Sequence, residues 1–131
     1  CLQPYLRNDL KISLNNNVVV INVRGGEFLN LGWSGEHDRC IYKKYVQQVY
    51  KYVTDPEFHV VTDDLQYAKK VLKGVCEIFK YHPPDPFSNF RVIYSSTYKI
   101  ISRSTFAKWA AFLSSDFSIS YFLDDHIIEN V

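Results

Sequence analysis

The sequence has 131 residues, which is the length of one domain, and a two-domain enzyme cannot fit within it. Hydrophobic residues make up 47% and aromatic residues 16%, and Gly and Pro number five each, which excludes disordered, collagen-like and low-complexity proteins. The 15 Lys and Arg balance 14 Asp and Glu, so the net charge of +1 provides no positive field to hold nucleic acid or an anionic membrane. We expect a single domain over residues 1–131 that must bind any anion through local groups.

The cysteines, Cys1, Cys40 and Cys76, have no short spacing and therefore encode neither a disulfide framework nor a zinc site, which indicates a reducing compartment. No apolar run approaches the ~18 residues of a membrane span, and the start lacks a secretory signal pattern. These features favour a cytoplasmic protein without a transmembrane segment. Because the chain opens on Cys1 and contains no Met, we expect a fragment whose upstream domain is missing.

The first half of the chain contains two predicted helices and two predicted strands. Residues 1–13, with apolar side chains from Leu2 to Ile12, predict a covering helix. The β-branched run 18–23 (VVVINV) is too short for a helix and predicts a buried strand. Apolar residues recur every four positions over 41–53, which is typical of an amphipathic helix, and Asp38 is its expected cap. A second strand is predicted at 58–62 (FHVVT).

The middle of the chain predicts a helix, a strand and a loop. Apolar residues mark a helix over 65–72, entered through Asp63-Asp64 and closed by Gly74 in a left-handed C-terminal cap. Residues 75–79 (VCEIF) predict a third strand. The three prolines within 81–88 predict a loop.

The last part of the chain continues the alternation of helices and strands. A short helix is predicted over roughly 89–95, and a second helix over 106–113 has Ser104 or Thr105 as its N-cap. Strands are predicted at 98–102 (YKIIS) and 117–121 (FSISY), and residues 124–131 are expected to form a terminal tail.

Alternating strands and helices favour an α/β fold, a Rossmann-like doubly wound parallel sheet of about five strands with right-handed crossovers. In such sheets ligands bind beyond the carboxyl ends of the strands, at the point where the strand order reverses. If the first and fourth strands are neighbours, that point lies between them.

Three segments follow predicted strands and could face such a ligand. Arg24-Gly25-Gly26-Glu27 supplies a fixed cation and flexible backbone N–H groups, and Asp63-Asp64 supplies two carboxylates. Arg103-Ser104-Thr105 precedes a helix, whose free N–H groups and dipole favour a phosphate. Taken singly, each has a structural explanation as a turn, a helix start or a cap. Their joint placement at three strand ends is what favours an anion site.

Other polar and aromatic residues receive a structural interpretation. Glu36-His37-Asp38 is interpreted as a solvated loop, because one histidine without a spaced partner is a weak metal or acid–base signal. His59, His82 and His126 are scattered. Trp109 lies in an apolar stripe expected to be core or interface.

The three strand-end segments also carry a family resemblance. Residues 22–28 (NVRGGEF), 61–64 (VTDD) and 100–113 (IISRSTFAKWAAFL) resemble, in this order, motifs of the fucosyltransferase superfamily, which contains the α-1,2-, α-1,6- and protein O-fucosyltransferases. The bacterial α-1,2 type is the most similar. Its motifs read His-x-Arg-Arg-Gly-Asp-Tyr, Ser/Thr-Asp-Asp and Asn-Ser-Ser-Phe-Ser-Trp-Trp-Gly-Ala-Trp-Leu, and the correspondence spans about residues 18–113.

The resemblance implies one half of a GT-B glycosyltransferase, the C-terminal nucleotide-sugar-binding half, with GDP-fucose as donor, a glycan acceptor, inversion at the anomeric carbon and no metal or other cofactor. Arg24 would grip the donor diphosphate, and Ser104 and Thr105 match paired serines near the phosphates. Gly26 and Phe28 match the motif glycine and aromatic residue. The donor-binding set is then Asn22, Arg24, Gly25, Gly26, Asn89, Arg103, Ser104, Thr105 and Phe106, with Arg24 and Glu27 as catalytic candidates and Asp63 and Asp64 shaping the site.

The chain also departs from the family motifs. Asn22 replaces the motif His, Gly25 the second Arg, Glu27 the Asp, and Arg103 the Asn before the paired serines. A guanine-recognising acid of the family stands seventeen residues before the motif Phe, where this chain has Asn89. Asparagine offers one acceptor oxygen and a donor nitrogen, so it fits the two guanine N–H groups less well than a carboxylate. Arg103 could restore the charge lost at Gly25 from across the crevice.

These features leave hypotheses from several classes. The first is a fucosyltransferase-like glycosyltransferase, whose acceptor site would lie on another domain. The second is a degenerate or non-catalytic domain that binds a nucleotide or glycan, which the motif departures favour. A phosphoacceptor receiver module would need acidic residues after the first strand, where the chain has Asn22-Val23-Arg24. A purely structural domain is the remaining alternative.

Overall fold

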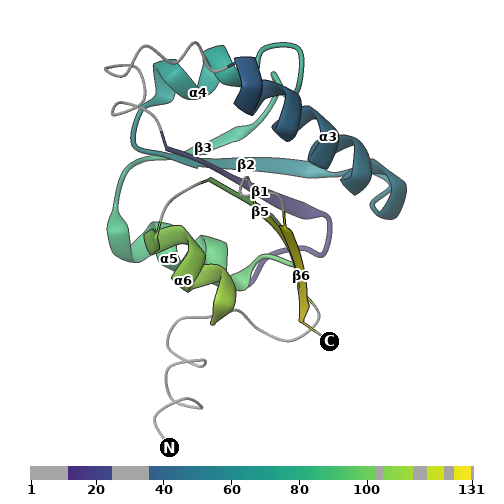
Figure 1. Cartoon of the computed structure of the whole chain (residues 1–131). Coiled ribbons are helices and arrows are strands. Elements are labelled where there is room, and N and C mark those ends of the chain that lie inside the picture. Colours follow the sequence, from purple (N-terminus) through teal and green to yellow (C-terminus); the bar gives the residue numbers. More distant parts are fainter. Residues whose placement is uncertain (1–11, 25–35, 103–104, 114–117, 123–125, 131) are drawn as a thin grey trace, which may run out of the picture.

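The structure, a computed structural model, describes residues 12–24, 36–102, 105–113, 118–122 and 126–130, in which strands and helices alternate (Figure 1). The strands are β1 (Val18–Val23), β2 (Glu57–Thr62), β3 (Lys80–His82), β4 (Tyr98–Ile101), β5 (Ser118–Phe122) and β6 (His126–Asn130). The helices are α3 (Glu36–Tyr52), α4 (Leu65–Val71), α5 (Pro86–Ser95) and α6 (Thr105–Phe112).

The strands form one sheet in the order β3-β2-β1-β4-β5-β6. The first five of these are parallel to their neighbours, and β6 runs antiparallel to β5. The β1 strand pairs with both β2 and β4. Strands β2 and β3 lie on one side of β1 and the later strands lie on the other side, so the strand order reverses between β1 and β4. The fold is therefore α/β and Rossmann-like, as predicted, and the condition for a binding edge between the first and fourth strands is met because these strands are neighbours.

Helices cover both faces of the sheet: α3 and α4 lie on one side and α5 and α6 on the other (Figure 1). All six residues of β1 are buried, as expected for a β-branched run between two helical layers. Alternate β1 side chains enter two separate cores. Val19, Ile21 and Val23 pack with residues of α3 and α4, and Val18 and Val20 with residues of α5 and α6.

The α4 helix begins after Asp64 and ends shortly before Gly74. Asp64 is the N-cap, and its side-chain oxygen Oδ1 accepts a hydrogen bond of 3.1 Å from the backbone N–H of Tyr67. The chain then turns at Gly74, whose φ of +78° is in the left-handed region that favours glycine. The predicted start of this helix and the left-handed glycine are confirmed, but the C-cap is Leu72 and Gly74 lies two residues beyond it.

The predicted third strand at 75–79 is wrong, because β3 spans Lys80–His82. The N–H groups of Val75 and Cys76 both donate to the carbonyl oxygen of Leu72, so these residues continue the turn at the end of α4. The predicted loop over 81–88 is also wrong in part. Helix α5 begins at Pro86, where proline is tolerated because the first helical turn needs no donor there, and Asp85 caps it.

Two other predictions are wrong, namely the start of the helix predicted over 41–53 and the terminal tail. Asp38 is not a cap and 36–38 are not a loop, because α3 begins at Glu36. The expected terminal tail contains β6, which pairs with β5. Trp109 is exposed and so lies outside the core, which leaves the interface alternative open, whereas Ala107, Ala110 and Ala111 of α6 are buried in the core. The predicted covering helix falls on residues 1–11, outside the described part, except for Ile12 and Ser13, which are not helical.

Candidate functional site

A cavity of about 410 Å³ opens at the carboxyl ends of β1 and β2, against the start of α5. Its position is the edge where parallel α/β sheets bind their ligands, next to the strand-order reversal between β1 and β4. The cavity is lined by Asn22, Val23, Arg24, Val61, Thr62, Asp63, Pro84, Asp85, Pro86 and Asn89.

Four residues that the sequence nominated for a site line this one cavity: Asn22, Arg24, Asp63 and Asn89. They come from three separate segments, at the ends of β1 and β2 and inside α5. The parallel pairing of β1 with β2 matches Val23 with Thr62, which brings the residues that follow each strand to the same edge. Asp64 is not part of the lining and serves instead as the cap of α4.

Several nominated residues lie outside the described part of the chain: Gly25, Gly26, Glu27, Arg103 and Ser104. Thr105 and Phe106 form the first residues of α6, shortly after β4. Because β4 neighbours β1, the start of α6 and Arg24 lie at the same edge of the sheet. The roles of these residues stay predictions.

Asn22 joins the three central strands at the cavity. Its side-chain oxygen Oδ1 accepts hydrogen bonds from the backbone N–H of Ser102, at 3.2 Å, and from the Ser102 hydroxyl, at 2.5 Å. Its Nδ2 donates to the carbonyl oxygen of Val61 at 3.4 Å. The side chain is buried, so these contacts replace hydration that it has lost. Asn22 therefore fixes the spacing of β1, β2 and the end of β4, which is a positioning role.

Asn89 is the buried polar group of the cavity wall. Its residue is 8% exposed, and its Oδ1 has no hydrogen-bond partner among the described residues. A buried oxygen without a donor is unfavourable by about 1–3 kcal/mol. A ligand that brings an N–H or O–H group to this wall would satisfy it.

The charges around the cavity come from Arg24, Asp63 and Asp85. Arg24 is the cation among the described lining residues. The carboxylate of Asp85 already accepts hydrogen bonds from the N–H of Phe87, at 3.2 Å, and from the Ser88 hydroxyl, at 3.1 Å. Its charge is therefore offset at the positive end of α5, and the Arg24 guanidinium is the fixed positive charge in the described lining.

Sequence reasoning missed Ser102 and Asp85 as parts of this site. The sequence predicts Ser102 as the last residue of a strand and gives no sign that it belongs to a site. Its hydrogen bond to the cavity residue Asn22 is what connects it to the site. Asp85 had a readable signal, because an aspartate followed by proline is the pattern of an N-cap and first helical residue.

Metal-ligand clusters and membrane-spanning helices were also sought among the described residues. Within the described ranges, no three His, Cys, Asp or Glu side chains come close enough to bind a metal ion together. None of the helices in the described part is both long and apolar enough to cross a membrane.

Comparison with known proteins gives one match. The family model described as Glycosyl transferase family 11 matches residues 4–124, which include every described element up to β5. Searches of the curated proteins and of the solved structures gave no match.

Proposed function

We propose that this chain, which belongs to glycosyl transferase family 11 and so to the fucosyltransferase superfamily, binds a GDP-sugar in the cavity between β1, β2 and α5. The sugar is fucose, and the reaction transfers it to a hydroxyl of a glycan acceptor with inversion at the anomeric carbon. The glycosyltransferase assignment comes from the family, whereas the donor, acceptor and stereochemistry are the proposal.

The observation that carries the proposal is the convergence of Asn22, Arg24, Asp63 and Asn89 on one cavity. The volume of about 410 Å³ falls within the ~300–1,000 Å³ of small-molecule sites. Asn89, whose side-chain oxygen has no partner among the described residues, lines the same cavity as the arginine Arg24. Both groups fit a ligand with a phosphate and a hydrogen-bonding base.

In the proposed reaction, the acceptor oxygen forms a bond to the anomeric carbon while the bond from that carbon to the diphosphate breaks. Negative charge grows on the departing diphosphate, and the Arg24 guanidinium stabilises it more strongly in the transition state than in the bound donor. The start of α6, at the same sheet edge, adds the backbone N–H group of Thr105, and the role of Ser104 at the phosphates is the one that the family resemblance implies. Glu27 is the proposed polar group beside the reacting hydroxyl.

The same arrangement leads us to propose metal-independent transfer, because fixed cationic and N–H groups would take the role of a divalent ion at the diphosphate. The expected result is equal donor affinity with added Mg²⁺ and with a chelator. A strict requirement for Mg²⁺ would contradict this part of the proposal.

Calorimetric titration of GDP, GDP-fucose, UDP and ADP into this chain tests the donor. Selective binding of the two guanine ligands is expected, with a loss of about tenfold or more in Arg24→Ala, the size of effect of one charge-assisted contact. Arg91→Ala is the matched control, since Arg91 is a half-buried arginine outside the cavity lining. Equal weakening in both variants would contradict a specific role for Arg24.

The second candidate is a domain that binds nucleotide without turnover, favoured by Asn89 at the position of the family's guanine-recognising acid. Asn89→Asp supplies a carboxylate that accepts two N–H groups, so guanine selectivity is expected to rise. Sugar transfer to a glycan acceptor by this protein would rule out this candidate. Binding of all four nucleotides with no transfer would support it.

A further inference from the structure

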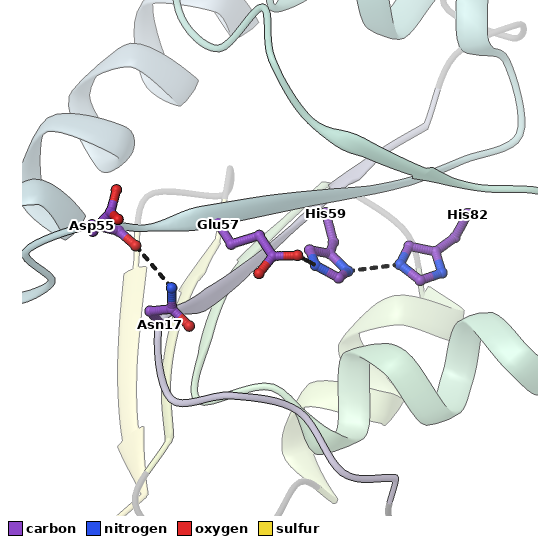
Figure 2. Close-up of polar contacts among 5 residues, drawn as sticks. All are labelled: Asn17, Asp55, Glu57, His59 and His82. Carbon is purple, nitrogen blue, oxygen red and sulfur yellow. Dashed lines mark hydrogen bonds and ion pairs between the residues drawn. The ribbon is translucent and has the colours of Figure 1, made fainter.

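Glu57, His59 and His82 form a line of side chains across the outer strands β2 and β3 (Figure 2). The Nδ1 atom of His59 lies 2.8 Å from Nε2 of His82, and Nε2 of His59 lies 3.0 Å from Oε1 of Glu57. The sequence treats the two histidines as scattered. Register explains their meeting, because Val61 of β2 pairs with His82, which places His59 and His82 diagonally on one face. We call these three residues the histidine relay.

Each of the two hydrogen bonds in the histidine relay requires a proton on one of the two atoms that it joins. A carboxylate only accepts, so His59 Nε2 carries the proton that faces Glu57. One proton then lies between His59 Nδ1 and His82 Nε2, donated by one ring and accepted by the other. The pair can gain one proton on the outer nitrogen of His82 without losing this bond. When both rings are cationic, both facing nitrogens carry hydrogens and the bond is lost.

His82 is the last residue of β3 and leads directly into the outer wall of the cavity. That wall is Pro84, Asp85 and Pro86. Within residues 83–86, only Asp85 has a backbone N–H, since the others are prolines. The segment therefore depends on its two ends, the cap of α5 and the three-residue edge strand β3. The side-chain bond to buried His59 is the anchor at the β3 end.

We propose that the histidine relay makes His82 a positioning residue, which holds the Pro84–Asp85–Pro86 wall against the cavity and weakens ligand binding when both imidazoles are protonated. The part that concerns ligand affinity rests on the proposed function, whereas the coupling of the wall to His82 does not. His82 is not among the cavity-lining residues, so it acts through the wall and not by touching the ligand.

The charges around the relay set the pH range of this effect. Burial, followed by the charges of His59 and Lys80, lowers the pKa of His82 from its ordinary value of 6.5. On α5, the Asp85 carboxylate is bonded to the Phe87 N–H and the Ser88 hydroxyl, and the Arg91 guanidinium lies over the Phe87 ring. Protonation of His82 is therefore expected below about pH 6.5, and near neutral pH the bond between the rings is intact.

Nuclear magnetic resonance of the ligand-free chain tests the coupling without reference to function. Between about pH 8 and pH 5, the amide signals of Asp85 and Asn89 are expected to move with the second protonation step of the histidine pair, as read from the imidazole signals. In His82→Gln that movement is expected to disappear, because the glutamine Nε2 still donates to His59 but does not titrate. Amide signals that ignore the imidazole midpoint, or that titrate equally in His82→Gln, would overturn the proposal.

Calorimetry with GDP tests the consequence for binding at about pH 7.5 and about pH 5.5. His82→Leu is expected to weaken binding about tenfold at the higher pH, while His82→Gln stays within about twofold of the unaltered chain. The GDP phosphate titrates near pH 6, so every variant is expected to lose some GDP affinity at the lower pH. The histidine pair is expected to cause a further loss of affinity in the unaltered chain that His82→Gln does not show.

The outcomes separate this inference from the proposed function. Wild-type binding in His82→Leu, with the circular dichroism of a folded chain, would overturn the positioning role. A pH loss in His82→Gln equal to that of the unaltered chain would do the same. Failure of the unaltered chain to bind GDP at either pH would contradict the proposed function, and the ligand-free amide titration would then decide the positioning role by itself.

Discussion

Removing the Asn22 side chain tests how the cavity edge is held together. In Asn22→Ala, the Ser102 N–H and hydroxyl lose their shared acceptor and the Val61 carbonyl loses a donor. These groups lie where β1, β2 and β4 meet, and Ser102 and Val61 are both buried. Water cannot fully replace the lost contacts.

The expected cost follows from the geometry of the three bonds. The 2.5 Å and 3.2 Å contacts to Ser102 are short enough to contribute about 1 kcal/mol each, and the 3.4 Å contact to Val61 adds little. Burying unsatisfied donors adds a further penalty of about 1 kcal/mol. Asn22→Ala is therefore expected to lower the unfolding free energy by about 2–4 kcal/mol.

Urea unfolding followed by circular dichroism measures this loss in a double-mutant cycle. Ser102→Ala removes the hydroxyl and leaves the backbone N–H, so each single variant loses stability and the pair loses less than their sum. A coupling energy of about 1 kcal/mol is expected between the two side chains. Strict additivity, or a loss below about 0.5 kcal/mol in Asn22→Ala, would refute the positioning role of Asn22.

Three further predictions concern stability. Burial lowers the pKa of Lys99 from 10.5 to about 7, so the unfolded chain binds more protons between these values and stability rises with pH there. The unfolding free energy measured in urea should rise by about 1 kcal/mol from about pH 7.5 to about pH 8.5, and this rise should be absent in Lys99→Met. Equal pH dependence of the unfolding free energy in both chains would contradict the prediction. Asp64→Ala should cost about 1 kcal/mol through the lost cap, against less than ~0.5 for exposed Asp63→Ala, and equal losses would count against the cap. Gly74→Ala should cost about 1–2 kcal/mol in thermal unfolding because of its φ of +78°, although no atom lies within 4 Å of the added Cβ, and unchanged stability would show that this φ is relaxed.

Much of the fold could be predicted because the strongest local signals agree with the tertiary structure. The run 18–23 is β-branched throughout and forms a central strand buried on both faces. The Asp64 cap and the Gly74 turn are local backbone chemistry that needs no distant partner. The position of Arg24 and Asp63 follows from a general rule of parallel sheets, because both residues come directly after adjacent strands.

The wrong predictions arose where a turn or a distant contact overrules the apolar pattern of a short segment. Residues 75–79 look like a strand, but the turn after α4 captures Val75, and Ile78 stays 91% exposed. The true strand Lys80–His82 is short and polar, and its pairing with β2 alone defines it. The contacts of Asn22 with Ser102 and of His59 with His82 join residues far apart in the chain, so no spacing rule could reveal them.

The central claim is that a nucleotide sugar binds at the edge where β1 and β2 end. Amide chemical shifts recorded while GDP is added to the isotope-labelled chain test it most directly. The account predicts saturable shifts gathered at Asn22, Arg24, Asp63 and Asn89. Shifts gathered instead at the opposite edge, around Asp55 and Lys80, or no shifts with the chain folded, would contradict it.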